Sequence, residues 1–171
     1  MKKLILYLLL SFIVSYGSYN VTILMIPNII YKVFHYKIVN NQNVQDNELK
    51  HFDIPNDQSR DVVMPNPDFL YSTSFYDLSN GDLNLKGKMP DSTYWSVSFY
   101  KPNTVNWFVK NDDEFIDNNL DMKITLSNSE LENSIVSPVK KGFMIIRILV
   151  EKKDSKSIDY YKALQKSITL N

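Results

Sequence analysis

The pattern of aromatic residues, serine and threonine between Asp61 and Phe108 constrains the fold of this chain most strongly. The segments Phe69–Tyr76 and Tyr94–Lys101 follow a two-residue period, with Trp95, Val97 and Phe99 of the second segment on one face. Successive side chains of a β-strand point to opposite faces of the sheet, so this alternation predicts strands. Asn80 and Gly81 between them accept the positive φ angles that tight hairpins require. An antiparallel sheet is therefore expected.

Shorter segments extend the sheet and close the chain. Further strands are expected at Leu83–Leu85, Val105–Lys110, Met122–Leu126 and, as the most apolar and central one, Gly142–Glu151. A helical turn is expected over Ser127–Leu131. Asp154–Leu170 has the period of a helix that buries one stripe, formed by Ile158, Tyr161, Leu164, Gln165 and Ile168. The predicted fold is mainly β: an antiparallel β-sandwich or half jelly roll with an N-terminal membrane helix and a C-terminal helix.

Composition excludes several classes of function. The formal net charge of +0 over 171 residues lacks the basic surface that nucleic-acid binding needs. The absence of cysteine removes thiol nucleophiles and zinc–thiolate sites, and two histidines supply little imidazole chemistry. Four glycines and no phosphate-binding motif argue against a nucleotide cofactor. We expect no cofactor, no metal and no nucleic-acid partner, and the sequence identifies no catalytic residue.

The amino terminus is uncharged from Leu4 to Ile26 after Lys2 and Lys3, which is long enough to cross a hydrocarbon core of about 30 Å. A cleaved signal peptide would end near Ser15-Tyr16-Gly17. An uncleaved anchor would contact the lipid bilayer through residues 4–26. The anchor is favoured because apolar residues resume after Gly17 and continue to Phe34. Lys2 and Lys3 favour an internal amino terminus, which places the rest of the chain outside the cytoplasm.

These patterns divide the chain into three parts. Residues 1–37 are expected to form the transmembrane or anchor helix, 38–61 a polar linker, and 62–171 the β-rich domain.

Three polar residues stand at the start of the first long strand. Prolines at 65 and 67 fix the backbone around Asn66, with Asp68 and Tyr71 following. They are candidates for ligand binding. The alternative is that Asn66 and Asp68 bind turn amides and Tyr71 fills the core.

Arg147 interrupts the apolar strand Gly142–Glu151, so its guanidinium is expected to be partly buried. An unpaired buried charge costs several kcal/mol, which predicts an ion pair with Asp68 or Asp77. The alternative is an arginine that binds a carboxylate or phosphate in a pocket.

Trp95 and Asn106, together with Phe99 and Trp107, are candidates for a concave face that takes a planar or sugar-like ligand. The alternative is that these aromatics form the core of a sandwich, because alternation buries one face of every strand.

Several segments resemble the domain-of-unknown-function 1254 family of bacterial proteins. They are Pro65–Ser72, Tyr76–Gly81, Pro90–Tyr100, Asn106–Phe108 and Gly142–Arg147, in this order. The match covers most of Met64 to Leu170, and the chain also resembles the short, membrane-anchored members of the family. The resemblance implies a jelly-roll-like domain on the periplasmic side of a bacterial inner membrane, held by a single-pass anchor. Longer relatives carry a second all-β domain, so a partner chain is expected to supply it here.

The sequence therefore favours a membrane-anchored, extracytoplasmic domain that acts as a non-catalytic binding or assembly module of the bacterial envelope. The alternative is an enzyme or small-ligand receptor with a polar pocket on the rim of the sandwich, formed by Asp68, Tyr71, Asn106 and Arg147.

Overall fold

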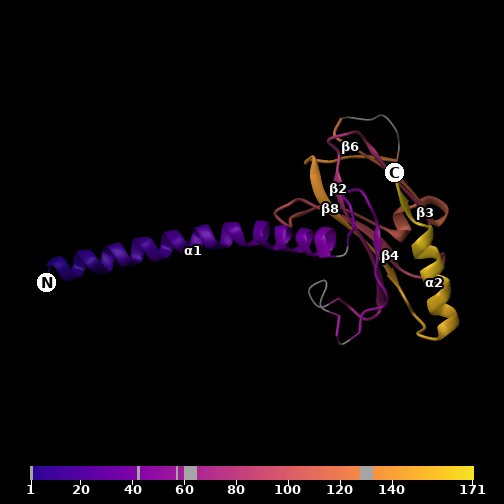
Figure 1. Cartoon of the computed structure of the whole chain (residues 1–171), viewed down its shortest axis with the longest axis horizontal. Helices are drawn as coiled ribbons and strands as arrows, with labels where there is room; N and C mark the ends of the chain where they lie inside the picture. Colours follow the sequence, from indigo (N-terminus) through magenta and orange to yellow (C-terminus); the bar gives the residue numbers. More distant parts are fainter. Residues whose placement is uncertain (1, 42, 57, 60–64, 128–132) are drawn as a thin grey trace.

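In a computed structural model, a long helix projects from a β-rich body (Figure 1). The structure describes residues 2–41, 43–56, 58–59, 65–127 and 133–171. The helix α1 (Lys2–Tyr36) continues into the π-helical turn η1 (Lys37–Asn41). The second helix, α2 (Ser155–Ser167), lies on the side of the body away from α1. The helical turn expected at Ser127–Leu131 falls largely outside the described residues.

Two sheets form the body, and the prediction of a mainly β fold with a helix at each end is confirmed. The larger sheet has the order β1 (Lys50–His51), β2 (Phe69–Asp77), β8 (Lys141–Leu149), β4 (Trp95–Tyr100) and β5 (Asn106–Asn111), with antiparallel neighbours throughout. The smaller has the order β7 (Ser134–Val136), β6 (Asn119–Thr125), β3 (Leu83–Lys88) and β9 (Thr169–Leu170), in which β6 and β7 run parallel. The short 3₁₀ turns η2 (Asp112–Glu114) and η3 (Ile116–Asn118) join β5 to β6.

The main core lies between the sheets. Alternation brings Trp95, Val97 and Phe99 of β4 to its centre, where each is 0% exposed. Residues of the smaller sheet, among them Leu85 and Met122, complete it. Trp95 and Phe99 of β4 therefore belong to the core of the sandwich and do not line a concave ligand-binding face.

The C-terminal helix closes the sandwich at one side. Asp154 caps it by accepting a hydrogen bond from the Ser157 N–H at 3.0 Å. Tyr161, Gln165 and Ile168 of the expected stripe are buried. The Gln165 side chain donates to the carbonyl oxygens of Phe52 and Tyr71, which fixes the helix to the edge of the larger sheet.

A second, smaller core joins the end of α1 to the larger sheet. Ile38 and Val44 are buried against Phe75 and Phe143, and the Phe34 ring lies 5.0 Å from that of Phe143 at a right angle. Much of the segment expected to be a linker thus packs on the sheet, and its residues Lys50–His51 add the strand β1. The helix is held to the body by side-chain packing.

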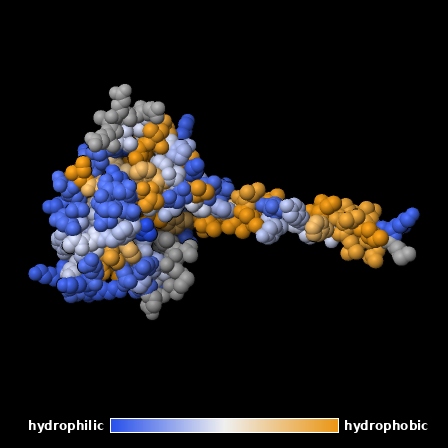
Figure 2. All heavy atoms as spheres, turned by 180° about the vertical axis from the view of Figure 1, so that it is seen from behind, coloured by the Kyte–Doolittle hydropathy of each residue, from blue (hydrophilic) through white to orange (hydrophobic). Residues whose placement is uncertain are grey.

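The rest of α1 stands clear of the body. The helix α1 is long enough and apolar enough to cross a membrane. A signal sequence has the same properties. None of its residues is buried. Figure 2 shows two apolar stretches along it, separated by a paler band that corresponds to the polar residues from Ser15 to Asn20.

Candidate functional site

The candidate site lies on the outer face of the five-stranded sheet, which points away from the smaller sheet. Side chains of neighbouring strands line up there in rows across the sheet. One row, the arginine row, consists of Tyr71 on β2, Arg147 on β8, Ser96 on β4 and Asn111 on β5. The end of α1 covers the same face farther along, at Phe75 and Phe143. The arginine row is therefore the polar part of a face whose other part is occupied by the helix.

Arg147 has no carboxylate partner within the described parts of the chain. Its guanidinium is half-buried, and its Nε donates to the Ser96 hydroxyl at 3.2 Å. The predicted ion pair of Arg147 with Asp68 or Asp77 is wrong, because each of these carboxylates is paired with a lysine. Lys153 lies 2.6 Å from Asp68, and Lys141 lies 2.7 Å from Asp77. The half-buried Arg147 therefore keeps most of its donors without an acceptor among the residues that the structure describes.

Buried hydroxyls lie in the same row as this cation and in the next row along the sheet. Ser96 is 0% exposed, and the adjacent row carries Thr73 and Ser98 on either side of Ile145, each hydroxyl residue 1% exposed. Thr73 Oγ1 and Ser98 Oγ have no hydrogen-bond partner. A buried hydroxyl without a partner costs about 1–3 kcal/mol, so two of them beside an uncompensated arginine are an unusual arrangement for a purely structural surface.

Aromatic rings border the arginine row on its other side. Phe69 and Tyr94 flank Leu149, and their ring centroids lie 6.1 Å apart in an edge-to-face arrangement. The Tyr94 hydroxyl donates to Asn111 Oδ1 at 3.0 Å, which ties this border to the arginine row. Tyr94 is exposed, so the rings remain accessible from solvent.

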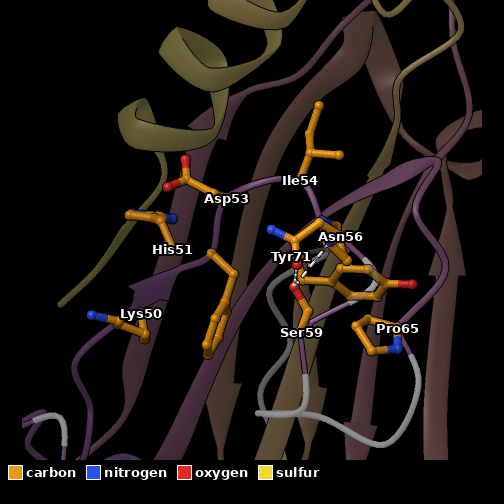
Figure 3. Close-up of a pocket in the computed structure, with 10 residues that line it drawn as sticks. Lys50, His51, Asp53, Ile54, Asn56, Ser59, Pro65 and Tyr71 are labelled. Atoms are coloured by element: carbon orange, nitrogen blue, oxygen red, sulfur yellow. Dashed lines mark hydrogen bonds between the residues drawn. The ribbon is translucent and has the colours of Figure 1, made fainter.

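A pocket of about 400 Å³ opens at the β1 edge of the same sheet. Figure 3 shows the Tyr71 ring beside Pro65, Asn56 and Ser59, with Lys50, His51 and Asp53 on the opposite side. Tyr71 thus belongs both to this pocket and to the arginine row. Its hydroxyl accepts a hydrogen bond from the Asn66 N–H at 3.1 Å.

Asp53 and His51 of the pocket already have partners. Lys162 lies 2.6 Å from Asp53 and holds the pKa of that carboxyl below its usual value. Burial, together with the charges of Lys166 and Lys50, lowers the pKa of His51, whose Nδ1 lies 2.8 Å from the Ser72 hydroxyl. A neutral imidazole and a neutralised carboxylate make this pocket a poor acid–base site.

The structure separates the remaining predicted residues. Asn66 Oδ1 accepts from the Asp68 N–H at 2.9 Å, the turn role that was one of the two interpretations. Trp95 lies in the core. Asn106 sits opposite Tyr100 at the far end of the sheet and donates to backbone carbonyls of Phe99 and Phe108. Of the six candidates, Tyr71 and Arg147 are direct cross-strand neighbours. Within the described residues, no group of three His, Asp or Glu side chains is placed to hold a metal ion.

Sequence reasoning missed Ser96, Ser98 and Thr73. A signal was present: in Tyr94–Tyr100 the serines alternate with core aromatics, so both must lie on the outer face. That Ser96 meets Arg147, and that Thr73 and Ser98 lie in the next row, depends on β8 lying between β2 and β4, which alternation does not reveal.

The Asp77–Lys141 pair gives a testable pH dependence. Lys141, with further hydrogen bonding from Ser79, lowers the pKa of Asp77 to about 2 from 3.8. A depressed folded-state pKa stabilises the fold above pH 3.8, and this contribution disappears as the pH falls towards 2. We expect Asp77→Asn to lower the free energy of unfolding by on the order of 1 kcal/mol at neutral pH, because Lys141 is more than half exposed and the pair is screened.

Urea unfolding of the full chain in detergent micelles at several pH values measures this effect. The difference between Asp77→Asn and the natural sequence should shrink to nothing at the acidic end. Asp121→Asn is the control. Asp121 lies 3.5 Å from Lys86, and both side chains are well exposed, so this ion pair is screened by solvent. A pH-independent difference would show that the charge of Asp77 contributes nothing.

Comparisons with known proteins agree with the fold. Residues 47–171 match the family described as "Protein of unknown function (DUF1254)". The VPA0106 protein of Vibrio parahaemolyticus has a crystal structure similar to this one, with a TM-score of 0.61 and 11% identity over 85% of this chain and 34% of that chain. An uncharacterized protein from Burkholderia cenocepacia gives 0.54 and 10%, over 73% and 36%. This chain therefore spans about a third of the length of these two proteins. No curated protein matches the sequence.

Proposed function

This chain belongs to the DUF1254 family, and from that premise we propose that it is a membrane-anchored binding domain without catalysis of its own. Its binding face is the outer face of the five-stranded sheet, and its ligand is a small molecule that contacts Tyr71 and Arg147. The single observation that carries this proposal is the half-buried Arg147, which has a hydroxyl partner and no carboxylate partner among the described residues.

Energetics supports a ligand there. A structural arginine is held by an acidic partner, because the desolvation of its charge is otherwise uncompensated. Here Asp68 and Asp77, the two acids expected to pair with Arg147, are taken by Lys153 and Lys141. The arrangement lacks a positioned nucleophile or an acid–base pair, which favours binding over catalysis.

Native mass spectrometry of the full chain in detergent micelles tests the proposal. The chain is incubated with a small-molecule extract of bacterial periplasm, beside the variant Arg147→Leu. We expect an adduct on the natural chain that the variant does not retain. Adducts that are equally abundant on both proteins, or absent from both, would contradict a site built on Arg147.

We propose that α1 spans the bacterial inner membrane once and holds the β-rich domain on the periplasmic side. The length and apolar character of α1, with Lys2 and Lys3 before it, support this orientation. Alkaline phosphatase fused after Asn171 should be active, because this enzyme forms its disulfides only outside the cytoplasm. If alkaline phosphatase is inactive at this position, and a reporter that works only in the cytoplasm is active there, the orientation is contradicted.

An assembly role is the second candidate. This chain covers 34% and 36% of the two solved structures, so each contains a large part that has no counterpart here. We propose that a partner chain supplies a second β-domain. Extraction in mild detergent followed by mass measurement should give a complex of two different polypeptides, whereas a single species with the mass of this chain would contradict the assembly.

A further inference from the structure

We infer that the arginine row binds an oxyanion, a carboxylate or phosphoryl group, carried by a flat apolar body. This inference rests on the proposed binding function and specifies the chemistry of its ligand. It depends on three features of the outer face: a cation without a carboxylate partner among the described residues, buried hydroxyls in the same and the next row, and an aromatic border.

The cation selects the charge of the ligand. A guanidinium presents five N–H donors in a planar fork, which matches the two oxygens of a carboxylate or phosphoryl group. Arg147 uses its Nε on Ser96, so its terminal nitrogens remain for such an acceptor. Lys50, which faces Thr73 in the adjacent row, adds a second positive charge to the same face. A neutral or cationic ligand would leave Arg147 uncompensated.

The hydroxyls provide further donors. Thr73 and Ser98 belong to the row next to Arg147, and consecutive residues on one face of a strand are about 7 Å apart. Both hydroxyls are buried without a partner, so they are the groups of this face that lack an acceptor. Ile145 between them packs against the second core, so a ligand oxygen that accepts from either hydroxyl has to displace this cover.

The border selects the body of the ligand. Phe69 and Tyr94 border the arginine row on one side, and the Phe69 ring centroid lies 6.2 Å from that of Tyr71 within the row. Partly exposed rings beside a charged group suit a ligand with an apolar ring next to its anionic group, since ring contacts add to the binding.

The side-chain Nε–H resonances of arginine test this inference directly, because the sequence contains two arginines, Arg60 and Arg147. The variant Arg147→Lys assigns the resonance by its loss. The full ¹⁵N-labelled chain in micelles is titrated with benzoate, phenyl phosphate, inorganic phosphate and the neutral analogue benzamide. We expect benzoate or phenyl phosphate to shift the Arg147 resonance in a saturable way. Inorganic phosphate should bind more weakly, and benzamide should not shift the resonance. Arg147→Gln should lose affinity by about tenfold to a hundredfold, as for hydrogen bonds to a charged group.

The outcomes separate the two proposals. If benzamide binds as well as benzoate, the face binds ligands and the oxyanion inference is wrong. If inorganic phosphate binds as tightly as phenyl phosphate, the inference that the ligand carries an apolar body is wrong. If no probe shifts the resonance, the inference is overturned, and the periplasmic-extract experiment decides separately whether the face binds another ligand.

Ser98→Ala provides an independent readout. Removing a buried hydroxyl without a partner should raise the unfolding temperature, while the affinity for benzoate falls severalfold. A merely structural hydroxyl would leave affinity unchanged. Ser11→Ala is the matched control, because Ser11 is exposed on α1, away from the sheet, and should change neither quantity.

Discussion

Replacing Phe75 with alanine is expected to lower the free energy of unfolding by about 3–5 kcal/mol, the range for a buried phenylalanine. Phe75 is 2% exposed and connects the sheet to the end of α1. Its ring centroid lies 4.7 Å from that of His35, 5.1 Å from Phe143 and 5.4 Å from Phe34. The substitution leaves a cavity where these rings meet, so the helix should also separate from the sheet.

Two measurements on the full chain in micelles check this prediction. Chemical unfolding gives the loss of stability, and limited proteolysis between residues 38 and 49 should become faster as the helix detaches. Phe12→Ala is the matched control, because Phe12 is 70% exposed on the same helix far from the sheet. If the free energy of unfolding of Phe75→Ala lies within about 1 kcal/mol of that of the control, the small core does not hold the helix to the sheet, and the domain is tethered loosely.

Replacing Gly142 with alanine is expected to cost about 3 kcal/mol, the upper end of the usual penalty for overpacking a core. A Cβ at Gly142 would overlap the hydroxyl and ring of Tyr76, its cross-strand partner, and lie 2.5 Å from the Tyr100 carbonyl oxygen. The ring cannot withdraw freely, because its hydroxyl accepts from Trp107 Nε1 at 3.2 Å and lies 3.3 Å from the Ser137 hydroxyl.

Thermal unfolding monitored by near-ultraviolet circular dichroism should report both the lower midpoint and the displaced aromatic side chains. The control is Gly17→Ala, since a Cβ at Gly17 meets no atom within 4 Å. Equal midpoints for the two variants would mean that Tyr76 does not pack over β8 as described.

Local patterns in the sequence are sufficient for most of this fold. Alternation defines β2 and β4, because each face of a sheet selects its own residue type over several consecutive positions. Asp154 marks the start of α2 for an equally local reason, since its side chain caps the first turn. The strands β1 and β9 have two residues each, too few to show any period.

The site is less predictable because it depends on register between distant strands. Arg147 was recognised as a half-buried cation from its position in β8, yet its partner could not be read from the sequence. Strand pairing sets Lys141 directly opposite Asp77, and that lysine occupies the carboxylate that Arg147 was expected to bind. The same pairing brings Ser96 to Arg147. Strand order and register, which arise from packing of the whole domain, therefore decide which of two plausible roles the arginine has.

The stability of Arg147→Leu tests the central claim most directly, namely that this arginine is kept for a ligand. If Arg147 has no internal counter-charge, an apolar replacement removes a desolvation cost and leaves only the Ser96 hydroxyl behind. Unfolding of the full chain in micelles, without added ligand, should then give a midpoint equal to or above that of the natural chain. A loss of about 3–5 kcal/mol, as expected when a buried ion pair is broken, would contradict the account.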